Sequence, residues 1–211
     1  MTTWAIIPVK QLSKAKSSLK PTLTPEQRHD LVLYMLEDVL STIKNAPPIK
    51  GTIVVSLDQQ ALDFACSKGA TPLTEPGVGL NKALNLAINR ARELGAKSAL
   101  ILPSDLPLLR PVDIEKIVGM ASGERDMVIT PSKRKGTNAL LLRPPDLIDL
   151  RFGGESFQAH LEEARRTGIM PHVYRSERVE TDIDEVSDLI KLKAQGLGTR
   201  SHDFLRVLEQ D

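Results

Sequence analysis

Two apolar segments, far apart in the chain and each ending abruptly in charge, constrain this sequence more than any other feature. The first, residues 4–9, is followed by Lys10 and Lys16, and the second, residues 99–103, is followed by Asp105. Continuous apolar runs of this kind are typical of strands buried on both faces of a parallel sheet. Ligands of open α/β sheets bind beyond the carboxyl ends of the strands, so we expect the lysines and the aspartate to converge on one ligand.

These side chains also indicate what the ligand is. Lysine ammonium groups suit phosphate, and aspartate carboxylates suit Mg²⁺. The combination predicts a nucleotide held through its phosphates and a metal, which makes nucleotidyl or phosphoryl transfer the first hypothesis. No GxxxxGK[ST] motif occurs, so a P-loop NTPase is disfavoured. Two alternatives stay open: the lysines form a solvated basic loop, or Asp105 only caps the turn that follows it.

Composition narrows the class of partner. The 211 residues carry 28 Lys+Arg against 27 Asp+Glu, a net charge of +1, and only 3% are aromatic, so neither a basic stripe nor a stacking platform indicates nucleic acid. No signal-peptide pattern and no apolar stretch long enough to cross a membrane occurs, which predicts a cytoplasmic protein without a membrane partner. The single cysteine, Cys66, has no partner for a disulfide or a zinc site, and we expect it to be buried on a helix.

Strand and helix patterns alternate along the chain, which predicts an α/β fold with a mostly parallel central sheet flanked by helices. Besides the first segment, we expect strands at residues 52–56, 99–102, 127–130, 139–142 and 172–174. We expect helices at residues 25–43, 59–68, 82–94, 111–121 and 156–167, and a final helical pair. No repeat or linker-like stretch interrupts the pattern, so we predict one domain over residues 1–211.

Two further acids, Asp182 and Asp184, lie near the end of the chain. We expect only one of them to point at a given face of the extended segment, with Asp184 as the N-cap of the next helix and Asp182 freer to approach Mg²⁺. Spacing alone leaves either as the metal ligand. The histidines show no metal-binding or catalytic spacing, and we assign structural roles to all four: His29, His160, His172 and His202. The last helix, over residues 203–210, packs either on its own core or on a partner.

Six segments, in this order along the chain, make the sequence resemble a known family. They are Pro8-Val9-Lys10, Ala15-Lys16-Ser17, Pro103-Ser104-Asp105-Leu106-Pro107, Gly136-Thr137-Asn138-Ala139-Leu140, Phe152-Gly153-Gly154-Glu155-Ser156-Phe157 and Asp182-Ile183-Asp184. The family is 2-phospho-L-lactate guanylyltransferase, the CofC type, of coenzyme F420 biosynthesis. The Asp105 motif is shared with many nucleotidyltransferases, whereas the GTNALLL and FGxxSF segments make the resemblance specific.

The resemblance implies a Rossmann-like nucleotidyltransferase fold of the GT-A type, Mg²⁺, GTP as co-substrate, a small phosphorylated carboxylic acid as acceptor, and a homodimer. It also implies roles for individual residues. Catalysis falls to Lys10, Lys16 and Asp105, and metal binding to Asp105 with Asp182 or Asp184. GTP binding falls to Lys10, Lys16, Glu75, Leu80 and Asn81, and acceptor binding to Thr137, Asn138, Gly153 and Ser156. Hydroxyl groups and the basic loop before Thr137 would hold the phosphate and carboxylate of the acceptor.

The implied reaction needs no catalytic histidine. A phosphate monoester has a second pKa near ~6, so the acceptor is largely a dianion at neutral pH and is already a nucleophile. Ser18 stands where many family members have arginine, which leaves the neutralisation of phosphate more dependent on Lys10 and Lys16. Three alternatives stay open. The acceptor is phosphoenolpyruvate or 3-phosphoglycerate, since discrimination between such acids amounts to only ~1–3 kcal/mol; the chain is a sugar-nucleotide or molybdopterin transferase, which would keep Asp105 but has no evident use for the GTNALLL and FGxxSF segments; or it is a non-catalytic nucleotide-binding module.

Overall fold

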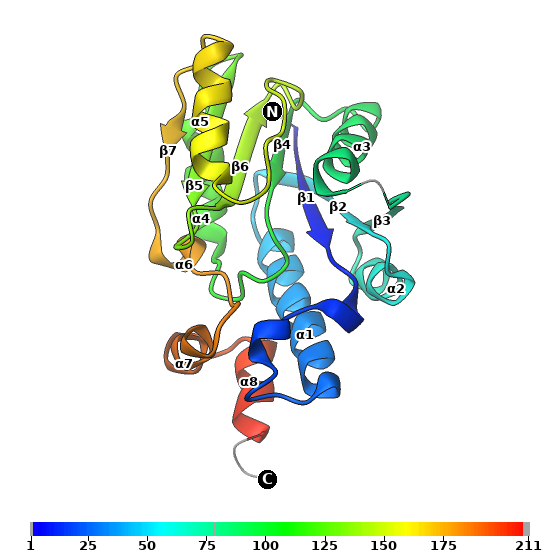
Figure 1. Cartoon of the computed structure of the whole chain (residues 1–211). Helices are drawn as coiled ribbons and strands as arrows, with labels where there is room; N and C mark the ends of the chain where they lie inside the picture. Colours follow the sequence, from blue (N-terminus) through cyan, green and yellow to red (C-terminus); the bar gives the residue numbers. More distant parts are fainter. Residues whose placement is uncertain (1, 78, 209–211) are drawn as a thin grey trace.

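The computed structural model describes residues 2–77 and 79–208, which form a seven-stranded sheet between layers of helices (Figure 1). Its strands are β1 (Thr3–Val9), β2 (Ile49–Ser56), β3 (Thr71–Thr74), β4 (Ser98–Ile101), β5 (Asp126–Pro131), β6 (Thr137–Arg143) and β7 (His172–Val173). They lie in the order β3-β2-β1-β4-β6-β5-β7, and only β6 runs antiparallel to its neighbours among these described strands. The predicted mostly parallel α/β sheet is confirmed.

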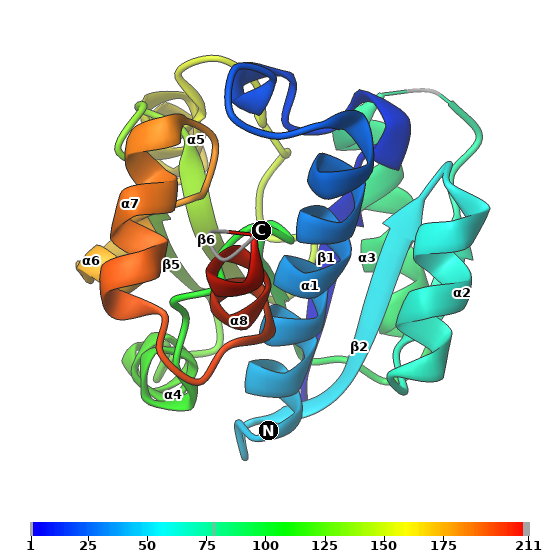
Figure 2. The same ribbon diagram turned by 90° about the horizontal axis from the view of Figure 1, so that it is seen from below.

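Helices cover both faces of this sheet. They are α1 (Pro25–Lys44), α2 (Gln59–Ser67), α3 (Leu80–Glu93), α4 (Pro111–Met120), α5 (Ser156–Arg166), α6 (Glu177–Glu180), α7 (Val186–Gln195) and α8 (Arg200–Val207), with two 3-10 turns, η1 (Leu12–Lys14) and η2 (Ser17–Leu19). One apolar core joins the sheet to α1, α2, α4, α7 and α8, and a second joins the opposite face to α3 and α5 (Figure 2).

The alternation of side chains along each strand explains why the strands read as continuous apolar runs. In β1, Ile7 belongs to the core on the α1 side and Ile6 to the core on the α3 side, and both are fully buried. Leu100 and Ile101 of the adjacent β4 divide between the two cores in the same way. Successive side chains of a strand point to opposite faces of the sheet. Where both faces are covered, every position is therefore buried, and apolar residues are favoured at all of them.

The start of α1 follows its sequence signal. Thr24 is the N-cap, Pro25 occupies the first turn, and Gln27 completes a capping box in which each side chain bonds the backbone N–H of the other. The helix ends at Lys44, as the Asn-Ala-Pro-Pro stretch predicts. At the other end of the chain, Asp38 of α1 accepts hydrogen bonds from the first backbone N–H groups of α8. Leu205 of α8 is buried in the same core, so this helix packs on its own chain.

The structure departs from the sequence predictions in several places. Strand β3 was not predicted because it is a short edge strand that contains a proline, a residue tolerated only at such positions. Thr137 and Asn138, predicted in a polar loop, open β6 and are buried. Cys66 is exposed on α2 rather than buried. Val78 of the glycine-rich loop and residues 209–210 of the predicted last helix lie outside the described residues.

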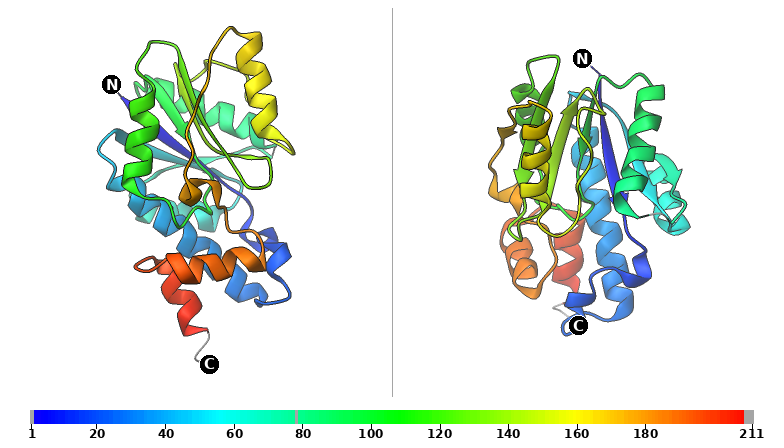
Figure 3. Two further views of the ribbon diagram at one scale, coloured as in Figure 1. Left: turned by 90° about the vertical axis from the view of Figure 1, so that its left-hand side faces the viewer. Right: turned by 45° about the horizontal axis from the view of Figure 1, so that its top comes forward.

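The carboxyl ends of β1, β2 and β4 point toward one end of the molecule. In Figure 1 the arrow of β1 descends toward the segment that carries η1 and η2, and α7 lies at the same end. Figure 3 shows α7 and α8 gathered there, opposite the N-terminus. Of the helices in the described part of the chain, none is long and apolar enough to span a membrane.

Candidate active site

A cavity of about 240 Å³ opens at the carboxyl ends of β1 and β4, where the sequence predicts the ligand site. Eight of the predicted site residues line it: Lys10, Lys16, Leu80, Asp105, Thr137, Asn138, Asp182 and Asp184. They come from five separate segments of the chain. Four predicted residues are not among those that line it: Glu75, Asn81, Gly153 and Ser156.

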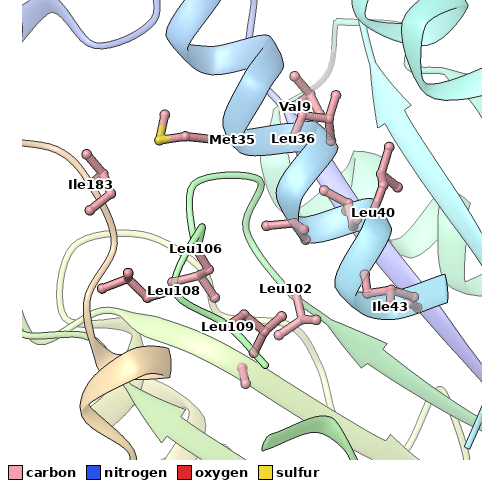
Figure 4. Packing of buried hydrophobic residues seen from close by; sticks show 14 of the residues in the cluster. Val9, Met35, Leu36, Leu40, Ile43, Leu102, Leu106, Leu108, Leu109 and Ile183 are labelled. Carbon is pink, nitrogen blue, oxygen red and sulfur yellow. The ribbon is translucent and has the colours of Figure 1, made fainter. Parts of the chain in front are cut away.

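Apolar side chains fix the two acidic segments in place. Asp105 lies between Leu102 and Leu106, which are fully buried beneath α1, and Asp184 follows Ile183, which is equally buried (Figure 4). The Ile183 backbone N–H donates to the carbonyl oxygen of Asp105 at 3.1 Å. Burial on both sides and this backbone bond bring carboxylates separated by about eighty positions to one wall of the cavity.

The Lys16 ammonium lies between two of these carboxylates. It donates to Asp105 Oδ2 and, at 2.7 Å, to Asp184 Oδ1, and its side chain is only 7% exposed. Its backbone adopts a left-handed conformation (φ 53°) between η1 and η2, which turns the side chain back into the cavity. Burial alone would lower the pKa of Lys16, but the charges of Asp105 and Asp184 outweigh it and raise the pKa above its usual value.

Asp182 reaches the cavity by a different set of contacts. Its carboxylate accepts from Asn138 Nδ2 at 3.1 Å and from the Arg134 guanidinium at 3.3 Å. Burial and the nearby charge of Asp105 raise the pKa of Asp182. The expectation that Asp182 and Asp184 point to different faces is wrong: side chains two positions apart in an extended segment point to the same side, and both line the cavity.

The start of α7 also differs from the prediction. Its N-cap is Glu185 rather than Asp184, and Asp188 accepts from the backbone N–H groups of both Asp184 and Glu185. Asp188 therefore satisfies the free donors at the helix start. This leaves the Asp184 carboxylate free to bind Lys16, which lowers its pKa against the opposing effect of burial.

Arg134 contacts an acid of the site from behind and was not among the predicted site residues. It bonds Asp182, Glu185 and Asp188, so one guanidinium links three acids around the start of α7. We expected the basic loop before Thr137 to hold the acceptor, but among the described residues none of 133–135 lines the cavity. Lys135 pairs with the exposed Glu155 instead. Nothing in the local sequence distinguished Arg134 from the lysines on either side of it.

The acidic wall has the donor chemistry of a magnesium site. Within residues 2–77 and 79–208, no three His, Cys, Asp or Glu side chains are grouped closely enough to hold a metal. Mg²⁺ does not require such a cage, since it is usually held by one or two carboxylates together with substrate phosphates and water. Asp105 Oδ1 is buried without a hydrogen-bond partner, and Asp182 and Asp184 line the same cavity. These residues fit the ion.

A second part of the cavity lining, called the hydroxyl wall below, is built from neutral hydrogen-bonding groups at Thr137. Thr137, at the start of β6, accepts from Ser156 Oγ at 3.2 Å, and Thr137 Oγ1 lies 3.1 Å from Nδ1 of His160. Ser156, predicted to bind the acceptor, does not line the cavity. Its hydroxyl donates to Thr137, which does. His160 is fully buried, and the sequence predicts a structural role for it because it matches no catalytic spacing.

Asn81 shapes the site without lining it. Its side-chain amide donates to the carbonyl oxygen of Phe152 at 2.9 Å and accepts from the Phe152 backbone N–H at 2.9 Å. Phe152 and Leu80 both line the cavity. The Asn81 amide thus already uses its oxygen and one N–H to anchor the FGxxSF loop. A direct contact with GTP would have to use the groups that remain. Glu75 carries a buried carboxylate oxygen, Oε2, for which the described residues provide no hydrogen-bond partner.

Comparisons with known proteins show what this chain is similar to. Residues 3–211 match the family model described as guanylyl transferase CofC like. The chain is similar to the phosphoenolpyruvate guanylyltransferases of Sphaerobacter thermophilus, with 40% identity over 91% of this chain and 93% of the relative, and Rubrobacter xylanophilus, with 41% identity over 93% and 96%. It is also similar to the 2-phospho-L-lactate guanylyltransferase of Methanobrevibacter ruminantium, with 35% identity over 97% of this chain and 91% of the relative.

Solved structures support the fold. A putative nucleotide-diphospho-sugar transferase from Desulfovibrio desulfuricans superposes with a TM-score of 0.79 at 17% identity, covering 99% of this chain and 95% of the other. A nucleotidyl transferase from Methanothermobacter thermautotroptrophicus superposes with a TM-score of 0.70 at 16% identity, covering 98% and 99%. At these identities the likeness concerns the fold alone. The nucleotidyltransferase fold expected from the sequence is confirmed.

Proposed function

The chain belongs to the CofC-like guanylyltransferase family, and from this premise we propose that it transfers GMP from GTP to 2-phospho-L-lactate, releasing pyrophosphate and forming lactyl-2-diphospho-5'-guanosine. The observation that carries the proposal is the convergence of Lys16, Asp105, Asp184 and Thr137 on one cavity. One cation and two carboxylates for a metal-bound triphosphate, and a hydroxyl for a second anion, suit such a transfer. Phosphoenolpyruvate is the second candidate acceptor, because the relatives at 40% and 41% identity carry that name.

The acceptor phosphate is the nucleophile of the proposed step. One of its oxygens attacks the α-phosphorus of GTP, a new P–O bond forms, and the bond from the α-phosphorus to the bridging oxygen breaks as pyrophosphate leaves. No proton has to be removed from the dianionic acceptor at neutral pH. Catalysis therefore rests on orientation and on offsetting negative charge, which Lys10 and Lys16 supply at the cavity.

The acidic wall has a separate task in this proposal. Asp105, with Asp182 or Asp184, would hold Mg²⁺, which when bound neutralises charge on the phosphate oxygens. Asp105 and Asp184 also hold the Lys16 ammonium against the cavity wall at short range. Asn138 and Arg134 orient Asp182 from behind. Hydrogen bonds from neighbouring side chains thus fix the orientation of these carboxylates.

Glu75, Leu80 and Asn81 complete the nucleotide side of the proposal. Leu80 lines the cavity at the N-terminus of α3, and Glu75 precedes the same glycine-rich loop. The unpartnered Glu75 carboxylate oxygen suits the N–H groups on one edge of guanine. Phe152 lines the cavity, and Gly153 is the next residue in the chain. The backbone N–H of Gly153 would donate to the acceptor. We also propose a homodimer that acts in the cytoplasm, where GTP and Mg²⁺ are available.

A mass-spectrometric assay tests the function directly. The purified protein is incubated with GTP, Mg²⁺ and, in separate tubes, 2-phospho-L-lactate, phosphoenolpyruvate and 3-phospho-D-glycerate, while pyrophosphate release is followed in parallel. A guanylylated 2-phospholactate adduct as the preferred product supports the proposal. Adduct from phosphoenolpyruvate keeps the reaction and changes the acceptor. Binding of GTP without adduct or pyrophosphate would identify a non-catalytic nucleotide-binding protein and contradict it.

A further inference from the structure

A buried histidine that the proposed reaction does not use lies directly behind the hydroxyl wall of the cavity. His160 is fully buried on α5, the only described histidine with no exposed surface. Its ring stands edge-on to the ring of Phe152, with centroids 4.7 Å apart and an interplanar angle of 73°. Nε2 accepts a hydrogen bond from the Arg151 backbone N–H at 3.0 Å, and Nδ1 lies 3.1 Å from Thr137 Oγ1.

These contacts fix where the imidazole carries its proton. A backbone N–H is always a donor, so Nε2 facing Arg151 must be the unprotonated nitrogen. A neutral imidazole then has its proton on Nδ1, from which it is donated to Thr137 Oγ1. Burial lowers the pKa of His160 to about 4, with the charge of Arg151 acting in the same direction and the Ser156 backbone and Glu163 acting against it. The ring is therefore neutral at physiological pH.

The direction of this bond determines what Thr137 can offer to a ligand. A threonine hydroxyl has one proton and two lone pairs. Thr137 Oγ1 accepts from Nδ1–H of His160 and from Oγ–H of Ser156, which uses both lone pairs. Its own proton has no acceptor among the hydrogen bonds of the described residues, and Thr137 lines the cavity. The hydroxyl can then act toward the cavity only as a donor.

We propose that His160 is a positioning residue, which through Thr137 fixes a hydrogen-bond donor toward an anionic oxygen of the acceptor, in its phosphate or its carboxylate. This inference rests on the proposed function, because the acceptor is the ligand that it concerns. A donor of fixed direction favours an anionic oxygen over any group that must itself donate. A freely rotating hydroxyl would bond either kind of group and would have to be ordered on binding.

The tautomer can be measured without any enzymatic reaction. We expect the ¹⁵N chemical shifts of histidine-labelled protein to show His160 neutral and protonated at Nδ1 at neutral pH, with His160→Gln identifying the signal. A His160 signal that is protonated at Nε2, or charged, at neutral pH would overturn the inference.

A double-mutant cycle tests whether His160 acts through the Thr137 hydroxyl. Thr137→Val should raise KM for the acid about tenfold, and His160→Gln about fivefold, with KM for GTP changed less than about twofold. The double variant should bind the acid no more weakly than Thr137→Val alone, because the hydroxyl that His160 orients is then absent. Additive losses would mean that His160 supports the fold without orienting Thr137, and would overturn the inference.

Two further variants separate positioning from stability. In His160→Asn the side-chain amide reaches the place of Nδ1 and restores a donor to Thr137, so this variant should recover most of the acid affinity that His160→Gln loses. His202→Gln removes another buried imidazole, on α8, and should lower the melting temperature while leaving KM for the acid unchanged. If His160→Asn binds the acid no better than His160→Gln, the proposed donor is not what the imidazole provides.

The same proteins distinguish failure of the inference from failure of the proposed function. If the wild type binds phosphoenolpyruvate or 2-phospho-L-lactate in calorimetry but transfers no GMP, the function is wrong, and the cycle is measured in dissociation constants instead. If the wild type binds neither acid, both proposals fail. Normal transfer together with an additive cycle contradicts the inference alone.

Discussion

The acidic wall and the hydroxyl wall of the cavity offer a ligand different kinds of interaction. The acidic wall, formed by Asp105, Asp182 and Asp184 with Lys16, is made of partly buried charges that pair with Lys16 or with Arg134. The hydroxyl wall, formed by Thr137 with Ser156 and His160 behind it, is neutral at physiological pH and is held by hydrogen bonds of defined direction. Charge supplies strength over a range of positions, whereas a directed hydroxyl selects the position of an oxygen.

This difference suits the two halves of the proposed reaction. Negative charge is already present on the triphosphate and spreads over its oxygens as pyrophosphate departs, so charged groups contribute most on that side. The acceptor is a small acid whose relatives differ by a few atoms, so discrimination there depends on direction and shape. Substitutions in the acidic wall should therefore lower kcat, and substitutions in the hydroxyl wall should raise KM for the acid.

The largest effect is expected for Asp105→Asn. The variant keeps the shape of the side chain and removes its charge, and we expect kcat to fall by about a hundredfold or more. Circular dichroism and the melting temperature should show that the protein remains folded. The exposed Asp149→Asn serves as the matched control. Turnover close to that of the wild type in a folded Asp105→Asn protein would remove this carboxylate from the mechanism.

Lys16→Met should have the next largest effect. It removes the cation between Asp105 and Asp184, and we expect kcat to fall about thirtyfold. The two carboxylates would then repel each other, so the pKa of Asp184, lowered by Lys16 in the wild type, should rise. Steady-state kinetics and titration of the labelled carboxylates measure the two consequences. A variant with normal kcat would show that Lys16 only neutralises the acids.

The neutral character of the hydroxyl wall predicts a pH dependence of stability. Folding lowers the pKa of His160 from 6.5 to about 4, so the unfolded chain binds a proton more readily between these values. Stability is therefore unaffected above pH 6.5 and falls as the pH drops, by about 2 kcal/mol at pH 5. Urea unfolding of the wild type and His160→Gln checks this, since the variant should lose that part of the slope. Equal slopes would contradict a buried neutral His160.

Thr137→Val tests the role of the hydroxyl wall. It should raise KM for the acid about tenfold and leave kcat within about threefold, because a hydrogen bond to a charged oxygen contributes ~1.5–3 kcal/mol. Steady-state kinetics with each substrate varied in turn separates the two effects. Ser67→Ala, which removes an exposed hydroxyl on α2 outside the cavity lining, is the control. A loss confined to kcat would mean that the two walls do not divide the reaction in this way.

The smallest effect is expected for Lys10→Met. Lys10 lines the cavity but is exposed, unlike Lys16, so its charge is screened by water and salt. We expect KM for GTP to rise about threefold at low ionic strength and less as salt is added. Kinetics over a salt series tests this. A loss as large as that of Lys16→Met, independent of salt, would place both lysines in the same buried contact with the triphosphate.

Local sequence signals predicted those parts of the fold that depend on neighbouring residues. The capping box at Thr24 and the proline after it fix the start of α1, and the apolar runs fix β1 and β4. Strand β3 escaped prediction because its pairing with β2, rather than its own four residues, makes it a strand. The sequence predicted Thr137 to lie in a loop because it follows a basic turn. Pairing with β5 makes it part of β6.

The candidate site divides in the same way. The sequence by itself predicted a ligand site from the residue types of Lys16, Asp105 and the two late aspartates, with Lys16 and Asp105 following apolar strands, whereas Thr137 was predicted only through the resemblance of the GTNALLL segment to the family. Only the tertiary structure decided how they are used: that Lys16 joins Asp105 to Asp184, and that His160 stands behind Thr137. The reason is that charge and strand patterns are local properties of a chain, whereas hydrogen-bond direction and burial exist only once distant segments have packed together.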